Sequence, residues 1–426
     1  MSLKTAVVSR LAEHFTSAKR QDKAREKVEA ARKKAGARHA LDYFHQVDDP
    51  YSHLTLQALN ILQDRFDVDI RLWLVGPPED WAAPERARLA DYARADCQIL
   101  AQRTGLSFTD FGSQPDADLV KTAQHDIGKC LGRPNAIPKA LMISFAFWAK
   151  TLPRPSGRFD LSAVTAGTQK RAQLGHFMGA MIHYGGEWYW GVDRLHYLEA
   201  RLNALGAKKG ESDFAFIFPP PALRLRLKAS IPSPRPVLEW YLSFRSPYTY
   251  LAASQVKKLA STYGIEVRLR FVLPMVMRGL TVPKLKSQYF TLDCAREARR
   301  LSVPFGRIAD PVGKPVERGY AILAWAIEQG RGLEFCEAFL KGVWSQGLDA
   351  GSDRDLQQIV EAASLDWGRA RSQLTVETWR AQAEANRVEL ERLGHWGVPC
   401  FVLKDRCVWG QDRLWVIGDA LANLSS

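Results

Sequence analysis

The sequence predicts an α/β fold that is built as two copies of one domain in tandem, and two observations carry this prediction. Residues 40–108 align without a gap onto residues 237–305, at an offset of 197. Each copy also shows one element order, read from its apolar periodicity: strand, helix, strand, a helical block, two strands and a last helix. Matches nearer the C-terminus have an offset of 219, so the second copy carries extra residues in its middle.

The chain is long enough for two such domains, and it contains a segment that can separate them. Its 426 residues are 46% hydrophobic, which is enough to bury two cores. A proline-rich stretch separates the copies, and prolines favour extended chain over regular pairing. We therefore predict a basic helical extension over 1–38, a first domain over 39–205, a Pro-rich basic linker over 206–235 and a second domain over 236–424.

The net charge of +13 is concentrated outside the two predicted domains. Residues 1–38 hold eleven Lys/Arg against four Asp/Glu, and residues 206–235 hold six against two. A nucleic-acid-binding fold carries its basic face on the domain itself, so this distribution argues against a nucleic-acid partner. Two interpretations of the extension stay open: a solvated helix, or a segment that binds a weak anionic partner.

The remaining composition bounds the location and the chemistry. No apolar run reaches the length that crosses a bilayer, and the N-terminus lacks the pattern of a secretory signal. The six cysteines include no Cys-x-x-Cys pair, which favours free thiols in a reducing cytoplasm. His176 and His395 match between the copies but lack ligand-type neighbours, so we expect no metal site.

The second copy gives the clearest element pattern. Val237–Leu242 is a short apolar run typical of a buried strand, and Ser246-Pro247 after it is a helix-start signal. A second strand is expected over 265–272. Gly397-Val398-Pro399 precedes the last two strands, and a final helix begins near Gln411. Helices are expected between these parts over 284–302, 316–329, 331–343, 353–363 and 376–393.

These segments together resemble the DsbA-like branch of the thioredoxin superfamily, in which a helical domain interrupts a thioredoxin fold. More closely, the second copy is similar to the 2-hydroxychromene-2-carboxylate isomerases and the kappa-class glutathione transferases. Three motifs in the right order carry the resemblance: Ser246-Pro247-Tyr248-Thr249-Tyr250-Leu251, Gly397-Val398-Pro399-Cys400-Phe401-Val402 and Trp409-Gly410-Gln411-Asp412-Arg413-Leu414. The resemblance covers nearly all of 236–424, is weaker over 39–205 and is absent from the first 38 residues.

The resemblance implies glutathione as cofactor and assigns roles to six residues. Ser246 would stabilise the glutathione thiolate at a helix N-terminus, where amides and dipole favour an anion, and Tyr248 lies beside it. Val398-Pro399 is implied to be a cis peptide whose main chain aligns the tripeptide. Gln411 and Asp412 would meet the γ-glutamyl end. Read from the residues alone, Ser246 could equally be a helix cap, and Asp412 could be structural, because Asp193 is its match in copy one.

The first copy lacks the parts that the resemblance makes reactive. Asp49 stands where copy two has Ser246, and its charge would repel a thiolate. Ala180 stands where copy two has Pro399, so Met178-Gly179-Ala180-Met181 is expected to run as plain strand or loop. We expect this domain to support the other one, by packing or by replacing the second subunit of a dimer; further oligomerisation stays open.

The leading prediction is a glutathione-dependent isomerase or transferase that acts on a small aromatic or electrophilic substrate in the C-terminal domain. The alternatives are a non-catalytic tandem binding protein and a thiol–disulfide oxidoreductase; the latter is disfavoured because Ser246 replaces the usual cysteine. Copy two also lacks the asparagine-bearing segment of the isomerases. Lys284 and Lys286 are the nearest cations for a carboxylate, and we interpret both as solvated helix charges, and Cys400 as a buried strand cysteine.

Overall fold

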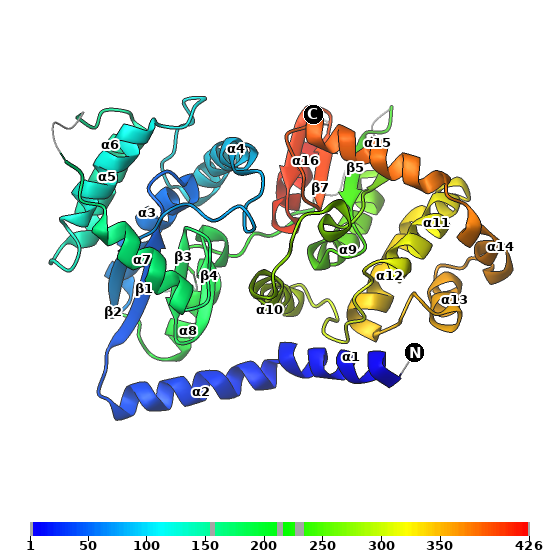
Figure 1. The fold of residues 1–426 in the computed structure, drawn as a ribbon, viewed down its shortest axis with the longest axis horizontal. Helices are drawn as coiled ribbons and strands as arrows, with labels where there is room; N and C mark the ends of the chain where they lie inside the picture. Colours follow the sequence, from blue (N-terminus) through cyan, green and yellow to red (C-terminus); the bar gives the residue numbers. More distant parts are fainter. Residues whose placement is uncertain (1–2, 154–157, 211–215, 226–233, 425–426) are drawn as a thin grey trace. The chain divides into compact units, whose positions relative to one another are not determined.

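The computed structural model describes residues 3–153, 158–210, 216–225 and 234–424, which form two compact units (Figure 1). The N-terminal unit comprises residues 22–220, and the C-terminal unit comprises residues 1–21 and 221–426. The predicted extension and the predicted linker are each divided between the two units. Within the described ranges, no helix combines the length and the apolar character that a bilayer crossing requires.

The N-terminal unit follows the predicted order of elements. Its first helical segment is part of α2 (Ala18–Lys34), which continues from the other unit. The strands are β1 (His39–His45), β2 (Val68–Leu74), β3 (Met181–Tyr184) and β4 (Glu187–Trp190). The helices are α3 (Pro50–Arg65), α4 (Arg86–Thr104), α5 (Ala117–Gly128), α6 (Ala136–Trp148), α7 (Ser162–Gln173) and α8 (Leu195–Ala204), with the short 3-10 turn η1 (Val192–Arg194) before α8.

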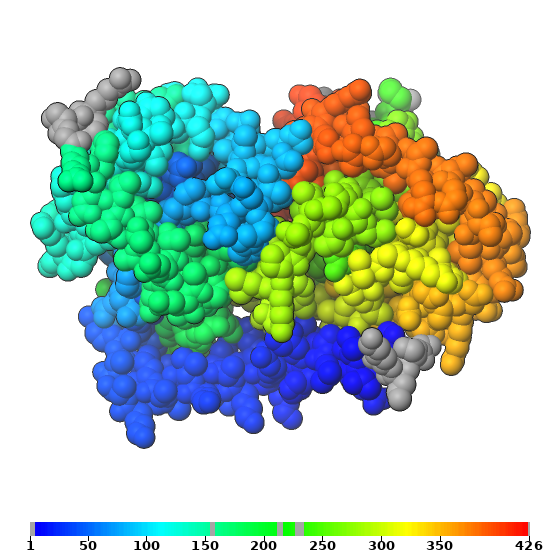
Figure 2. Space-filling view, viewed as in Figure 1, coloured from blue at the N-terminus to red at the C-terminus, as the bar shows by residue number. Residues whose placement is uncertain are grey.

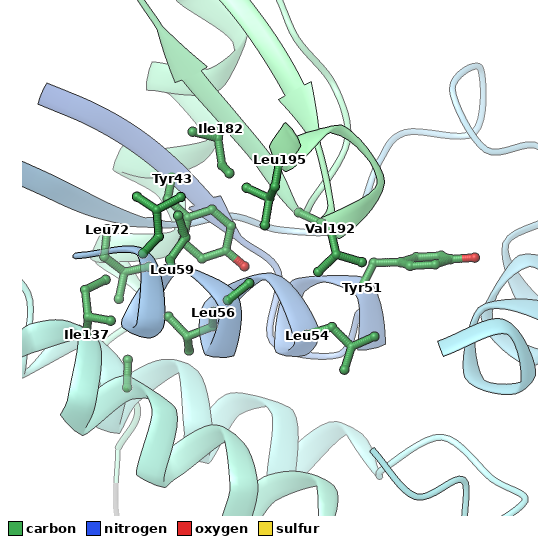
Figure 3. Packing of buried hydrophobic residues seen from close by; sticks show 14 of the residues in the cluster. Tyr43, Tyr51, Leu54, Leu56, Leu59, Leu72, Ile137, Ile182, Val192 and Leu195 are labelled. Atoms are coloured by element: carbon green, nitrogen blue, oxygen red, sulfur yellow. The ribbon is translucent and has the colours of Figure 1, made fainter. Parts of the chain in front are cut away.

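The sheet of this unit has the order β2-β1-β3-β4, and its core lies between the sheet and α3. β1 pairs with β2 in parallel and with β3 antiparallel, and β3 and β4 form a hairpin. Figure 3 shows Tyr43 and Leu72 from the sheet facing Leu59 of α3, with Ile137 of α6 next to them. Tyr51 at the start of α3 points away from the other labelled side chains of this cluster.

The C-terminal unit repeats this plan with a longer helical block. It starts with α1 (Leu3–Thr16), and its strands are β5 (Val237–Leu242), β6 (Glu266–Phe271), β7 (Cys400–Leu403) and β8 (Arg406–Trp409). Its helices are α9 (Pro247–Tyr263), α10 (Lys284–Arg300), α11 (Lys314–Glu328), α12 (Gly332–Lys341), α13 (Asp353–Ala362), α14 (Trp367–Ser372), α15 (Thr378–Arg392) and α16 (Leu414–Asn423). The short turns are η2 (Met275–Arg278), η3 (Gly342–Gln346), η4 (Gln373–Thr375) and η5 (Gln411–Arg413).

The two sheets have the same topology, and the mixed α/β class is confirmed. The second sheet has the order β6-β5-β7-β8, with β5 and β6 parallel and the other pairs antiparallel. The added helical block accounts for the larger offset near the C-terminus. α14 was not among the predicted helices; Asp366 caps its start by accepting from the Arg369 amide.

α1 packs more closely than its sparse apolar residues led us to expect. Ser9 and Thr16 are both buried, and the Thr5 hydroxyl donates to Asp349 at 3.3 Å. Gly306 and Gly347 make the approach possible, because a Cβ on Gly347 would lie 2.4 Å from the Ser9 hydroxyl and one on Gly306 2.7 Å from Thr16 Oγ1. Val7, Val8 and Leu11 of α1 are exposed. Figure 2 shows this helix in dark blue.

Candidate functional site

Ser246 lies where the sequence predicts it, at the N-cap of α9 in the C-terminal unit. Its hydroxyl oxygen accepts from the Thr249 amide at 3.2 Å, which satisfies one of the amides that a helix start leaves open. The same hydroxyl donates to the Val398 carbonyl oxygen at 3.3 Å. The side chain therefore caps the helix and also bridges to the loop before β7.

The Val398–Pro399 peptide bond is cis, which is the geometry that the resemblance implies. Two contacts hold the loop around it. Pro399 accepts from the Gly410 amide at 2.9 Å. Gly397 lies against the ring of Trp409, where a Cβ would come within 2.5 Å of a ring carbon, so only glycine allows this approach.

Arg278 is a third support of this loop, and the sequence analysis did not identify it. From η2, its Nη2 donates to the Trp396 carbonyl oxygen at 2.8 Å, two residues before Val398. Its Nε is buried and makes no hydrogen bond within the described ranges, and burial lowers the pKa of Arg278. The internal alignment places Trp81 and Phe177 at the corresponding positions of copy one, and their rings are in contact, 5.1 Å between centroids.

Tyr248 is engaged by the fold rather than left open. Its hydroxyl donates to Asp293 at 2.8 Å, and Arg296 also binds that carboxylate at 2.8 Å. In the N-terminal unit, the matching Tyr51 donates to the matching Asp96 at 2.7 Å. Because this contact recurs in both copies, it belongs to the architecture that they share, and the Tyr248 hydroxyl is already engaged by Asp293.

Gln411 and Asp412 are brought to the start of α16 but differ in exposure. Gln411 is 2% exposed, and its amide donates to the fully buried Glu297 at 2.9 Å. Asp412 is partly buried and lies 3.6 Å from Arg413 as an ion pair. Its carboxylate approaches Gly410, where a Cβ would come within 2.7 Å of Oδ1. Of the two side chains, Asp412 is the one that has surface for a ligand.

The solvated interpretation is wrong for Lys286. Lys284 is exposed, but Lys286 is 6% exposed, with its ammonium 5.8 Å from the ring centroid of Phe290. Burial lowers the pKa of Lys286 to about 8, because the charged form loses hydration. Helical periodicity alone does not distinguish this position from a surface lysine.

Cys400 is the buried strand cysteine that the sequence predicts. It is fully buried in β7, and its sulfur donates to the Gly397 carbonyl oxygen at 3.1 Å. Burial raises the pKa of the Cys400 thiol well above its usual range. The thiolate, which is the reactive form, is therefore suppressed.

The matching place in the N-terminal unit is closed by hydrogen bonds. Asp49 caps α3 by accepting from the amides of Tyr51 and Ser52. The Ser52 hydroxyl donates to Asp49 at 2.8 Å and accepts from the Ala180 amide at 2.8 Å. Loss of hydration raises the pKa of Asp49 to about 7. The loop at Gly179 comes so close that a Cβ there would lie 2.7 Å from Gln46.

The loop of copy one is bent rather than plain strand. Ala180 has φ of 54°, which is the left-handed region that side chains disfavour, and β3 begins only at Met181. Its amide is the donor to Ser52, so the bend is held by a bond that a proline at this position could not make.

This unit also buries histidines in uncharged form. Burial lowers the pKa of His45 and His176 to about 3 and that of His53 to about 4. Leu242 and Tyr250 stand at the positions of copy two that match His45 and His53.

The arrangement in the C-terminal unit suits an anionic sulfur. A helix N-terminus offers unpaired amides and a positive dipole end, and a hydroxyl at that point is a further donor. The main chain at Val398 supplies groups for an added extended segment. No cysteine stands at position 246, so this site has no thiol of its own for a redox cycle.

Comparison with known proteins agrees with this placement. Residues 237–422 match the family model of the DSBA-like thioredoxin domain. A 2-hydroxychromene-2-carboxylate isomerase from Pseudomonas putida is 24% identical over 202 residues, 44% of this chain and 95% of that protein. Another from Sphingobium xenophagum is 24% identical over 193 residues, 42% and 93% respectively.

Two solved structures are also similar to part of this chain. One is a 2-hydroxychromene-2-carboxylate isomerase, with TM-score 0.39 and 21% identity over 44% of this chain and 95% of that one. The other is the cytosolic disulfide reductase DsbM from Pseudomonas aeruginosa, with TM-score 0.34 and 19% identity over 44% and 100%. The C-terminal half of this chain thus matches the DsbA-like thioredoxin domain and, within it, the branch that contains the 2-hydroxychromene-2-carboxylate isomerases.

Proposed function

We propose that this protein is a glutathione-dependent isomerase or transferase, that both units are DsbA-like copies, and that only the C-terminal one is active. The substrate would be a small aromatic or electrophilic compound. One observation carries the proposal: a hydroxyl at a helix N-terminus lies 3.3 Å from the carbonyl oxygen of the residue before a cis-proline, and the other copy has neither part. The isomerase names of the relatives point in the same direction.

The residues present fit glutathione in this role. Ser246 has one hydroxyl hydrogen, now directed to Val398, which it can turn to a sulfur at the helix start. Val398 would align the tripeptide main chain, with Tyr248 beside it through its ring, and Asp412 would accept from the amino end. Gln411 would act indirectly, by its bond to Glu297 that fixes the start of α16. Bound glutathione would supply a thiolate nucleophile.

Calorimetric titration with glutathione tests the proposal. We expect wild type to bind one equivalent and Ser246→Ala to lose about a hundredfold in affinity for the thiolate form. Ser246→Asp is the matched control for folding, because it keeps a good helix cap and installs the copy-one residue. It should remain as stable as wild type and still fail to bind. Absence of binding by the wild-type protein would contradict the proposal.

A specific observation favours a second candidate, in which the basic extension binds an anionic ligand. A shallow, open cavity of about 620 Å³ lies where α1 meets α2, lined by Arg10, Glu13, His14, Ser17, Lys19 and Arg307. Three permanent cations face one carboxylate there, a net of two positive charges that suits a dianion such as phosphate. Arg307 is 3.7 Å from Glu13, too far for a hydrogen bond, and its buried Nε makes none within the described ranges.

Titration with inorganic phosphate at constant ionic strength tests this candidate. Arg307→Ala should weaken binding about tenfold, since a charge-assisted hydrogen bond is lost. Lys23→Ala is the control. It also removes one positive charge, but Lys23 lies in α2 and does not line the cavity. Equal weakening by both variants would mean diffuse attraction and would contradict a site at this cavity.

A further inference from the structure

Thr249 carries a polar group that the fold leaves unsatisfied. It lies in the first turn of α9 and is fully buried, and its Oγ1 makes no hydrogen bond within the described part of the chain. The large majority of buried side-chain hydroxyls in proteins make a hydrogen bond, so an exception needs an explanation. Here the exception lies on the residue whose amide donates to Ser246.

The matching residue of the N-terminal unit has no such deficit. Ser52 is also fully buried, and its hydroxyl has three partners. It donates to Asp49 at 2.8 Å, and it accepts from the amides of Ala180 at 2.8 Å and Gln46 at 3.2 Å. One helix position is therefore fully satisfied in one copy and orphaned in the other.

The missing partners coincide with the candidate site. Pro399 has no amide hydrogen where Ala180 donates, and Ser246 replaces the carboxylate of Asp49 that accepts. Both positions differ between the copies, with Asp49 and Ala180 in copy one and Ser246 and Pro399 in copy two. The changes that provide a cis-proline and a hydroxyl at the helix start thus also remove two of the three partners that the matching hydroxyl has in copy one.

We propose that Thr249 is a positioning residue that completes its hydrogen bond only when glutathione is bound. The inference rests on the proposed function. Ser246 then turns its hydrogen from the Val398 carbonyl to the sulfur, and Thr249 rotates about its Cα–Cβ bond so that its hydroxyl donates to Ser246 Oγ. A chain of hydrogen bonds strengthens the outer donor, and the thiol proton leaves to solvent. The unliganded state leaves Thr249 unpaired, so binding also relieves that deficit.

The test is the pKa of the bound glutathione thiol, followed by thiolate absorbance against pH. Thr249→Val is close in shape and removes only the hydroxyl, so this pKa should rise by about one unit, a tenfold loss of thiolate stabilisation. Thr249→Ser should restore it. The melting temperature of Thr249→Val should be unchanged or higher, because an unsatisfied buried polar group has been replaced by an apolar one.

Ser52→Ala in the N-terminal unit is the matched control. It removes a satisfied hydroxyl, so it should lower the melting temperature and leave the thiol pKa unchanged. Glutathione bound by Thr249→Val with the wild-type thiol pKa would overturn the inference and leave the proposed function standing. A Thr249→Val melting temperature as low as that of Ser52→Ala would also overturn it, as a structural role. If the wild-type protein binds no glutathione, both proposals fail.

Discussion

The two copies differ in how they bond the polar groups at the start of the first helix, where it lies beside the loop before the third strand. In the N-terminal unit, Asp49, Ser52 and Ala180 bond to one another and close the place. In the C-terminal unit, Ser246 makes one bond to Val398, and Thr249 makes none through its side chain within the described ranges. At this place the N-terminal unit therefore pairs its buried hydroxyl internally, whereas the C-terminal unit leaves the matching hydroxyl unpaired within the described ranges.

The largest expected effect comes from forcing the copy-two residue into copy one. Ala180→Pro should destabilise the N-terminal unit by about 3 kcal/mol, because proline holds φ near −65° and has no hydrogen for Ser52. Chemical denaturation measures the change. Ala180→Gly, which tolerates positive φ, should not destabilise. Equal stability of the proline variant and wild type would mean that the bend at Ala180 is not required.

The next effect is on ligand binding in copy two. Ser246→Ala should raise the dissociation constant for the glutathione thiolate about a hundredfold, as expected for a lost donor to a developing or full anion. Asp49→Asn in copy one should leave that constant unchanged. A comparable loss in Asp49→Asn would show that the copies share one ligand, against the assignment of the site to residues 236–424.

The third effect is on the pH dependence of stability, and it concerns the buried histidines of the N-terminal unit. The pKa values of His45 and His176 are about 3 in the fold, so below about pH 6.5 the unfolded chain binds protons that the folded chain does not. Stability should then fall as pH drops from about 6.5 to about 4, by about 1.4 kcal/mol per pH unit for each such histidine. Asp49, with its pKa raised to about 7, acts in the opposite direction over the same range.

His45→Leu checks this expectation, since leucine is the copy-two residue at that position. Its unfolding free energy, measured from pH 4 to pH 7, should fall less steeply toward acid than that of wild type. An unchanged slope would mean that His45 is protonated in the fold.

The smallest effect is expected at the loop support. Arg278→Ala removes the bond to the Trp396 carbonyl and should weaken glutathione binding several-fold, about 1 kcal/mol. Trp81→Ala removes the corresponding contact of copy one and should affect only stability. If both variants weaken glutathione binding equally, Arg278 has no role that is specific to the C-terminal unit.

The sequence was sufficient to predict features that depend on residues close together in the chain. The Asp-Pro and Ser-Pro helix starts, the strand pattern and the residues of the cis peptide could be read in order along the chain. It missed features that depend on what packs against a residue. The Gln411–Glu297 bond and the support from Arg278 each join segments far apart in sequence. The burial of Lys286 is also not indicated by its position in the helical pattern. The unpaired hydroxyl of Thr249 likewise depends on the residues that surround it in the fold.

The unreactive thiol of Cys400 has a consequence for disulfide formation in the C-terminal unit. It directly follows the cis-proline, yet burial keeps it protonated. A tripeptide sulfur held nearby would not be captured as a mixed disulfide, because the neighbouring sulfur offers no nucleophile. If the proposed function holds, Cys400 would therefore remain a free thiol while glutathione is bound beside it.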